Sequence, residues 1–163
     1  MWRRWLRLGL LPALLLASGC QATGMGWIPS ALVPTDKATF GFVFDGTTST
    51  LSGSYHDPQG TTTMFGVVDV AFKGTGVMRP CKAGDPACVN APPAKGGCLL
   101  GELQYDSQNP KIPGSGFFFL LVCDADGNGP SVNGDFVLLT VDTGPYTGYR
   151  NTGNPQGNIT VKM

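Results

Sequence analysis

The sequence has little room for a helix once its first residues are set aside. Its 163 residues include 24 glycines and 13 prolines, and these are spread along the whole chain. After the N-terminal segment, the longest run free of both is Phe117 to Asp126. An amphipathic helix of ordinary length does not fit between such interruptions. The absence of helix-length runs therefore excludes helical bundles and folds that alternate strands with helices.

Residues that carry chemistry are also scarce. His56 is the only histidine, and the chain has neither a G-x-S-x-G nor a G-x-x-x-x-G-K-[ST] motif. Nucleophilic catalysis therefore lacks a base, and phosphate groups lack their usual glycine-rich loop. Only 13% of residues are charged. Without the three arginines of the N-terminal segment, eight basic residues face eleven acidic ones, which predicts no nucleic-acid partner.

Short stretches with the alternation of strands fill the rest of the chain. In Ala38 to Asp45, for example, every second residue from Phe40 to Phe44 is phenylalanine, the pattern of a half-buried strand. Turn residues separate such stretches at intervals of roughly 8 to 12 residues. We expect strands over residues 38–45, 47–55, 61–73, 98–105, 117–123, 136–141, 146–149 and 158–162. This spacing predicts an all-β fold, a small antiparallel β-sandwich or barrel, as one domain over residues 27–163.

The stretch from Gly116 to Asp142 is the expected centre of that fold. It holds the most apolar run after the N-terminal segment, Phe117 to Cys123, and a second strand-like run, Phe136 to Val141. A loop of aspartate, asparagine and glycine joins the two runs. Two apolar strands joined by such a loop predict a hairpin against which the other strands pack.

The first twenty residues form a targeting segment. Arg3, Arg4 and Arg7 precede the apolar run Leu8 to Leu16, and Ala17-Ser18-Gly19-Cys20 follows it. The apolar run is short for a membrane span of about 20 residues, so cleavage is expected. Ala17-Ser18-Gly19-Cys20 resembles a bacterial lipobox, with alanine where leucine is usual. The alternative is an ordinary secretory signal in which Cys20 is incidental.

The lipobox resemblance implies that Cys20 carries a lipid and becomes the first residue. Residues 1–19 would then be the signal peptide, residues 20–26 a tether, and the protein would be anchored to a membrane without spanning it. In such lipoproteins an aspartate after the cysteine favours retention in the inner membrane. Gln21 stands there, which implies sorting to the outer membrane of the cell envelope.

The other cysteines form an even set, as expected in an exported chain. They are Cys81, Cys88, Cys98 and Cys123. If Cys98 to Tyr105 pairs antiparallel with Gly116 to Cys123, the two cysteines at the ends of these strands lie opposite each other. We therefore predict the disulfides Cys98–Cys123 and Cys81–Cys88. A zinc site is the rival interpretation, but the spacing lacks the paired C-x₂-C pattern.

The loop after Cys123 suggests a calcium site. Asp124, Asp126 and Asn128 stand at positions one, three and five, Gly129 at six, and Asp135 at twelve. Hard oxygen ligands in this order wrap Ca²⁺ in D-x-D-x-N-G loops. The alternative is a hairpin loop built from good turn formers.

Several short motifs carry a resemblance to a known family. They are Lys37 to Phe42, Gly53 to Asp57, Gly134 to Phe136, Tyr146 to Tyr149 and Gly157 to Ile159. Together they are similar to the uncharacterised secreted bacterial β domains often labelled "post-COAP", from which the segment Cys81 to Cys98 departs. The resemblance implies a small exported β domain and no established activity.

The expected function is a non-enzymatic structural or interaction role in the cell envelope. The alternative is a calcium-dependent module that binds envelope polysaccharide or an adhesive protein partner. A hydrolase using carboxylates such as Asp57 and Glu102 is a third possibility. Four aromatic residues present a similar choice between a ligand platform and core packing. They are Trp27, Tyr105, Tyr146 and Tyr149.

Overall fold

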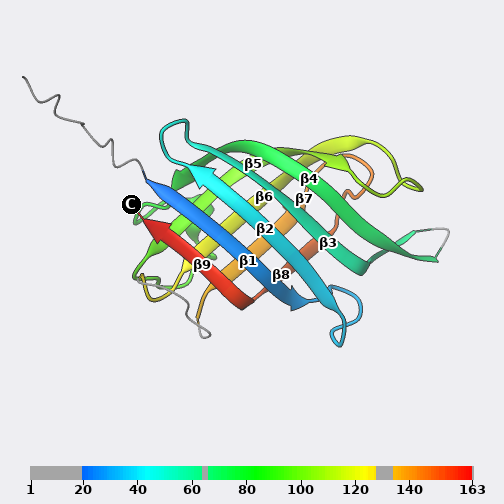
Figure 1. The fold of residues 1–163 in the computed structure, drawn as a ribbon, viewed down its shortest axis with the longest axis horizontal. Helices are drawn as coiled ribbons and strands as arrows, with labels where there is room; N and C mark the ends of the chain where they lie inside the picture. Colours follow the sequence, from blue (N-terminus) through cyan, green and yellow to red (C-terminus); the bar gives the residue numbers. More distant parts are fainter. Residues whose placement is uncertain (1–19, 64–65, 128–133, 163) are drawn as a thin grey trace, which may run out of the picture.

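The computed structural model describes residues 20–63, 66–127 and 134–162. Nine strands form a single antiparallel sheet in the order β8-β7-β6-β5-β4-β3-β2-β1-β9 (Figure 1). The strands are β1 (Gln21–Pro29), β2 (Lys37–Asp45), β3 (Thr50–Thr63), β4 (Gly66–Pro80), β5 (Gly97–Ser107), β6 (Ser115–Asp124), β7 (Phe136–Val141), β8 (Arg150–Gly153) and β9 (Gln156–Lys162). Among the described residues the only helical element is a short 3₁₀ turn, η1 (Pro86–Cys88). The all-β prediction is confirmed. The expected signal segment, residues 1–19, lies outside the described residues.

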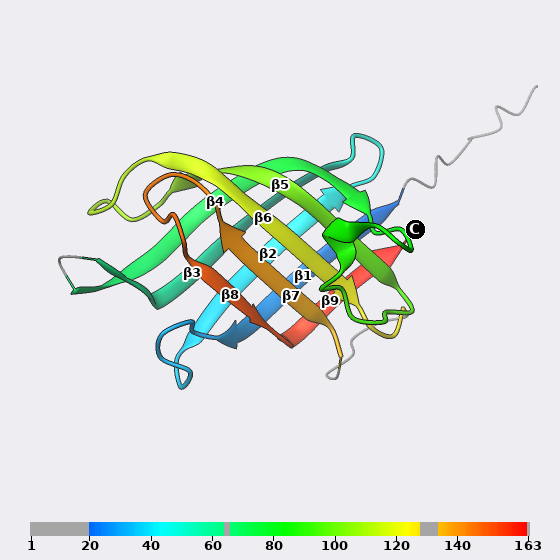
Figure 2. The ribbon, with the colours of Figure 1, turned by 180° about the vertical axis from the view of Figure 1, so that it is seen from behind.

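The sheet curls until its two ends approach each other, as the two opposite views show (Figures 1 and 2). β9 closes the order beside β1, and only two residues separate it from β8 at the other end of the sheet. The side-chain amide of Asn151 on β8 donates a hydrogen bond of 2.9 Å to the carbonyl oxygen of Pro29 on β1. The result is a barrel-like shape in which one face of every strand points inward.

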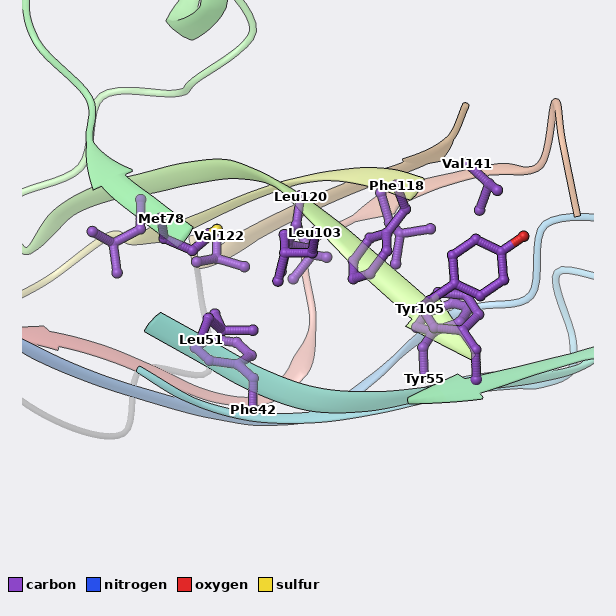
Figure 3. Close-up of a cluster of buried hydrophobic side chains, with 14 of the residues drawn as sticks. Phe42, Leu51, Tyr55, Met78, Leu103, Tyr105, Phe118, Leu120, Val122 and Val141 are labelled. Atoms are coloured by element: carbon purple, nitrogen blue, oxygen red, sulfur yellow. The ribbon is translucent and has the colours of Figure 1, made fainter. Parts of the chain in front are cut away.

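Aromatic and aliphatic side chains fill the inside of the curled sheet (Figure 3). The ring of Phe72 lies 4.9 Å from that of Tyr105 and 5.0 Å from that of Phe118, between centroids. Glycines make room for these rings, because a Cβ atom at Gly74 would collide with Phe118. The alternation of large and small residues is how small closed sheets fill their interior. One interior hollow of about 30 Å³ lies among the described residues, with room for about two water molecules.

The expected tether over residues 20–26 is wrong, since most of it belongs to β1. Gln21 pairs with Asp45 of β2 on one side and with Lys162 of β9 on the other. The segment is rich in glycine and alanine, so it lacks the side chains by which a strand is usually identified. The structural domain therefore starts directly after Cys20.

One expected turn and one expected strand are placed differently in the structure. The strands expected over 47–55 and 61–73 are not separated by a turn, because residues 56–60 continue β3, whose register against β4 shifts between Asp57 and Thr61. Pro58 sits in this bulge, where the absence of its N–H costs no ladder bond. Residues 146–149 form a turn instead of a strand, and the strand β8 follows immediately. The strands predicted over 38–45, 98–105, 117–123 and 136–141 are confirmed within two residues at each end.

The described part of the chain contains no helix with the length and mean hydropathy of a membrane span.

Candidate functional site

Both predicted disulfides are present. Cys98 and Cys123 lie directly opposite each other on β5 and β6, with their Cα atoms 4.1 Å apart, and the same register places Tyr105 opposite Gly116. Cys81 and Cys88, 5.9 Å apart between Cα atoms, close a short loop after β4. In the loop-entropy description the long and short bridges stabilise the fold by roughly 3.5 and 2.5 kcal/mol.

The segment from residue 81 to residue 96, here called the cysteine loop, covers the outer face of the central hairpin. Leu121 on β6 and Leu138 on β7 point away from the interior, yet they are almost completely buried. Ala91 and Ala94 of the cysteine loop pack against this second apolar cluster. The loop that departs from the family resemblance therefore covers an apolar patch that would otherwise face solvent.

Two aspartates of the predicted calcium loop hold the free edge of β9. Asp124 is completely buried and Asp135 is 1% exposed. One carboxylate oxygen of Asp124 accepts a hydrogen bond from the backbone N–H of Val161 at 2.8 Å, and one of Asp135 accepts from that of Ile159, also at 2.8 Å. Their remaining oxygens accept from the N–H groups of Gly127 and Ala125 at 2.9 and 3.0 Å. We call these two carboxylates the edge clasp.

The edge clasp replaces a missing neighbour strand. Ile159 and Val161 are two residues apart on β9, the spacing at which the N–H groups of a strand point toward the same neighbouring strand. An uncovered edge of this kind would present unpaired N–H groups, which are costly when buried and promote association when exposed. Burial raises the pKa of Asp135, an effect increased by the negative charges of Asp124 and Asp126 and opposed by its two backbone hydrogen bonds. Closure of the curled sheet thus depends on two carboxylates from the β6–β7 connection.

The calcium hypothesis stays a prediction. Asp124 and Asp135 lie close enough to serve one site, but all four of their oxygens already accept backbone hydrogen bonds. Asp126 is exposed on the same loop, and Asn128 lies outside the described residues. No group of three or more metal-binding histidine, cysteine or acidic residues occurs in the described part of the chain. A calcium ion would therefore have to share these oxygens with the edge clasp.

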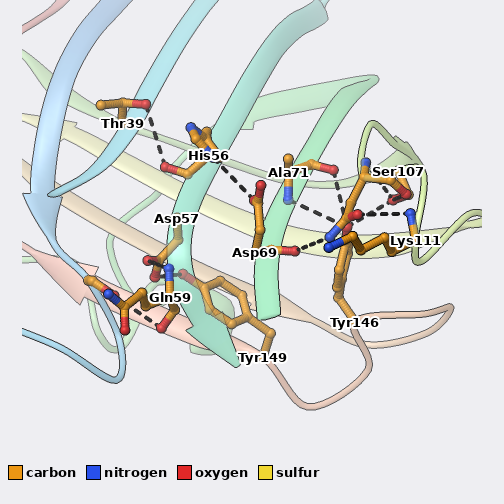
Figure 4. Close-up of polar contacts among 12 residues, drawn as sticks. Thr39, His56, Asp57, Gln59, Asp69, Ala71, Ser107, Lys111, Tyr146 and Tyr149 are labelled. Atoms are coloured by element: carbon orange, nitrogen blue, oxygen red, sulfur yellow. Dashed lines mark hydrogen bonds and ion pairs between the residues drawn. The ribbon is translucent and has the colours of Figure 1, made fainter. Parts of the chain in front are cut away.

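A polar cluster closes the opposite end of the interior (Figure 4). Asp57 is completely buried, and its carboxylate accepts hydrogen bonds from the hydroxyl of Tyr149 at 2.8 Å and from the N–H of Ala31 at 3.0 Å. The hydroxyls of Tyr149 and Tyr55 are 2.6 Å apart. Because the hydroxyl hydrogen of Tyr149 is donated to Asp57, Tyr55 is the donor in the bond between the two hydroxyls, and the side-chain amide of Asn151 donates to Tyr55. Burial raises the pKa of both tyrosines, so both phenols stay protonated donors.

The residues considered for acid–base chemistry are not brought together. Asp57 is buried inside the curled sheet, whereas Glu102 on β5 is exposed. His56 lies on β3 rather than in a turn, and its Nε2 atom is 3.2 Å from a carboxylate oxygen of Asp69 (Figure 4). This exposed contact belongs to the surface of the sheet.

The tyrosines belong to the core and not to a ligand platform. Tyr105, Tyr146 and Tyr149 are nearly completely buried. Trp27 lies on the outside of β1, where the ammonium of Lys37 stands 4.5 Å from the centre of its ring. Stacking of a sugar on an aromatic surface formed by these four residues is therefore not available.

Comparisons of the chain with protein-family models, with curated proteins and with solved structures found no match. The resemblance to secreted bacterial β domains thus stays a prediction, and so does the lipobox.

Proposed function

We propose that the chain is a lipid-anchored domain of the cell envelope with a structural or interaction role and no catalytic activity. The observation that favours an interaction role on the outer surface is the filled interior. Ligand pockets usually enclose about 300 to 1,000 Å³, and the interior hollow here has about 30 Å³. A partner would therefore contact the outer surface, while the core serves as a rigid support.

The anchor is proposed at Cys20. It follows the sequence features of an export signal, and it directly precedes the first strand of the sheet. Two disulfides fit an oxidising compartment outside the cytoplasm. Two or more acyl chains would hold the protein stably at the bilayer, each buried methylene adding about 0.8 kcal/mol.

Membrane fractionation of a bacterium that expresses the full chain tests the anchor. We expect the protein in the membrane fraction and the Cys20→Ser variant outside it, released or retained as precursor. Ser18→Ala, a change of similar size within the signal, serves as the matched control and should fractionate like the original protein. Equal distribution of the Cys20→Ser variant and the original would contradict the proposal.

A second candidate function is calcium-dependent binding of an envelope polysaccharide or an adhesive partner. It is favoured by the closeness of three carboxylates, since the charges of Asp124 and Asp126 both act on Asp135. A divalent cation would relieve that repulsion, and extracellular calcium loops bind at about 10⁻⁴ to 10⁻³ M.

Thermal unfolding in EDTA and in millimolar calcium tests this candidate, with Asp126→Ala alongside. A rise in Tm with calcium that the variant loses would support a metal site. Superimposable curves in the two buffers would eliminate it and leave the edge clasp as the role of Asp124 and Asp135.

A further inference from the structure

The position of Cys20 leaves no flexible linker between an attached lipid and the folded domain. Gln21, the next residue, is already paired with strands on both sides. Cys20 itself is partly buried against the core, and a side chain at Gly46 would collide with the Cys20 carbonyl oxygen. A lipid attached to the Cys20 sulfur would therefore hold one end of the curled sheet at the bilayer surface.

That end of the sheet is defined by the strand directions (Figures 1 and 2). Beside Cys20 it carries the β2–β3 turn at residues 46–49, the cysteine loop and the last residue of β9, Lys162. The opposite end carries the connections at residues 30–36, 108–114 and 142–149.

We propose that the Cys20 end of the domain lies on the lipid surface and that the cysteine loop contacts the bilayer through Val89. This inference rests on the proposed lipidation of Cys20 and adds the orientation of the domain and the side chain that meets the lipid. Val89 is 79% exposed, the highest value among the large hydrophobic residues described as exposed. It directly follows Cys88, so the Cys81–Cys88 disulfide restricts its position.

The local structure of the cysteine loop supports a lipid contact. The N–H of Val89 donates to the carbonyl of Pro86, and that of Ala91 donates to Cys88, so the backbone groups around the tip are partly paired. Paired backbone groups lower the cost of entering the headgroup region. An apolar side chain flanked by cations suits the boundary between headgroups and acyl chains. Lys82 and Lys95 are exposed in the same loop.

Tryptophan fluorescence of the full chain, reconstituted in vesicles, tests this orientation. Trp27 is the only tryptophan after residue 19. In a Trp27→Phe background, Val89→Trp reports on the cysteine loop, and Leu32→Trp serves as the matched probe at the opposite end, where Leu32 is 45% exposed. The vesicles contain phosphatidylcholine and phosphatidylglycerol, with or without bromine on the acyl chains. Far-UV circular dichroism confirms that each variant is folded.

We expect brominated lipid to quench most of the Val89→Trp emission and to leave that of Leu32→Trp nearly unchanged. Equal quenching of both probes, quenching of Leu32→Trp alone, or quenching of neither would overturn the proposed orientation. The mass of the N-terminal peptide is measured on the same sample, and a Cys20 without lipid would refute the anchor proposal separately. In that case, coupling the variants through Cys20 to a maleimide lipid still tests which end faces the bilayer, with the same outcomes.

Discussion

Replacing Asp124 by asparagine should weaken the closure of the curled sheet. Asparagine keeps one oxygen and puts an NH₂ group in place of the other, so either Gly127 or Val161 loses its acceptor. The carboxylate accepts from these N–H groups at 2.9 and 2.8 Å and is completely buried, so water cannot replace it. A buried N–H group without an acceptor costs about 1 to 3 kcal/mol. We expect the free energy of unfolding to fall by about 2 kcal/mol, or Tm by about 4 to 8 °C for a domain of this size.

Urea unfolding followed by circular dichroism measures this loss. The experiment is done in EDTA, so that loss of a bound metal cannot cause the difference. Asp106→Asn is the matched control, because Asp106 is exposed on β5 and its loss should change stability by less than about 0.5 kcal/mol. Amide exchange gives a local readout, in which the Val161 N–H should exchange faster in Asp124→Asn. Equal stability of the two variants, with unchanged exchange at Val161, would refute the edge clasp.

Three further outcomes are expected. Joint replacement of Cys98 and Cys123 by alanine should lower the free energy of unfolding by roughly 3.5 kcal/mol in urea titrations, and a loss below about 1 kcal/mol would contradict the entropic account. Burial raises the pKa of Tyr55 and Tyr149, so their contribution to the free energy of unfolding is fully present below the unfolded pKa near 10 and is lost above it, by about 1.4 kcal/mol per pH unit per residue. Absorbance at 295 nm should show that both tyrosines ionise only as the protein unfolds, and their ionisation in the folded state would contradict this. Gln21→Asp should move the lipidated protein to the inner membrane in sucrose-gradient fractionation, and an unchanged outer-membrane position would argue against the sorting expectation.

The central hairpin could be predicted from the sequence because several local signals agree there. Phe117 to Cys123 is continuously apolar, Phe136 to Val141 follows a turn-rich loop, and a cysteine stands at the end of each of two neighbouring strands. The disulfide requires Cys98 and Cys123 to lie opposite each other, and this fixes the register of β5 against β6. Where side-chain pattern and a covalent constraint coincide, sequence reasoning gave the pairing correctly.

The strands that the sequence did not predict, β1 and β8, have weak side-chain patterns. β1 carries glycine or alanine at Ala22, Gly24 and Gly26, where neighbours such as the Phe42 ring fill the space that larger side chains would otherwise occupy. β8 is only four polar or glycine residues long, and its place is set by pairing with β7. In both cases packing against neighbouring strands decides the structure, and this packing cannot be predicted from the local sequence pattern.

The role of Asp124 and Asp135 could not be read from their loop. An aspartate next to glycine and asparagine fits a turn and a calcium loop equally well. The hydrogen-bond donors that distinguish the edge clasp belong to Ile159 and Val161, 24 and 37 residues away along the chain. Only the curl of the sheet brings β9 to this loop, and curl depends on the summed twist of all the strands.

The mass of the N-terminal peptide, from the full chain expressed in a bacterium and isolated from its membranes, tests the central claim most directly. The account predicts a peptide that begins at Cys20 and carries a diacylglyceryl group on the cysteine sulfur. A peptide that begins elsewhere, or one that begins at Cys20 with an unmodified thiol, would contradict a lipid-anchored domain.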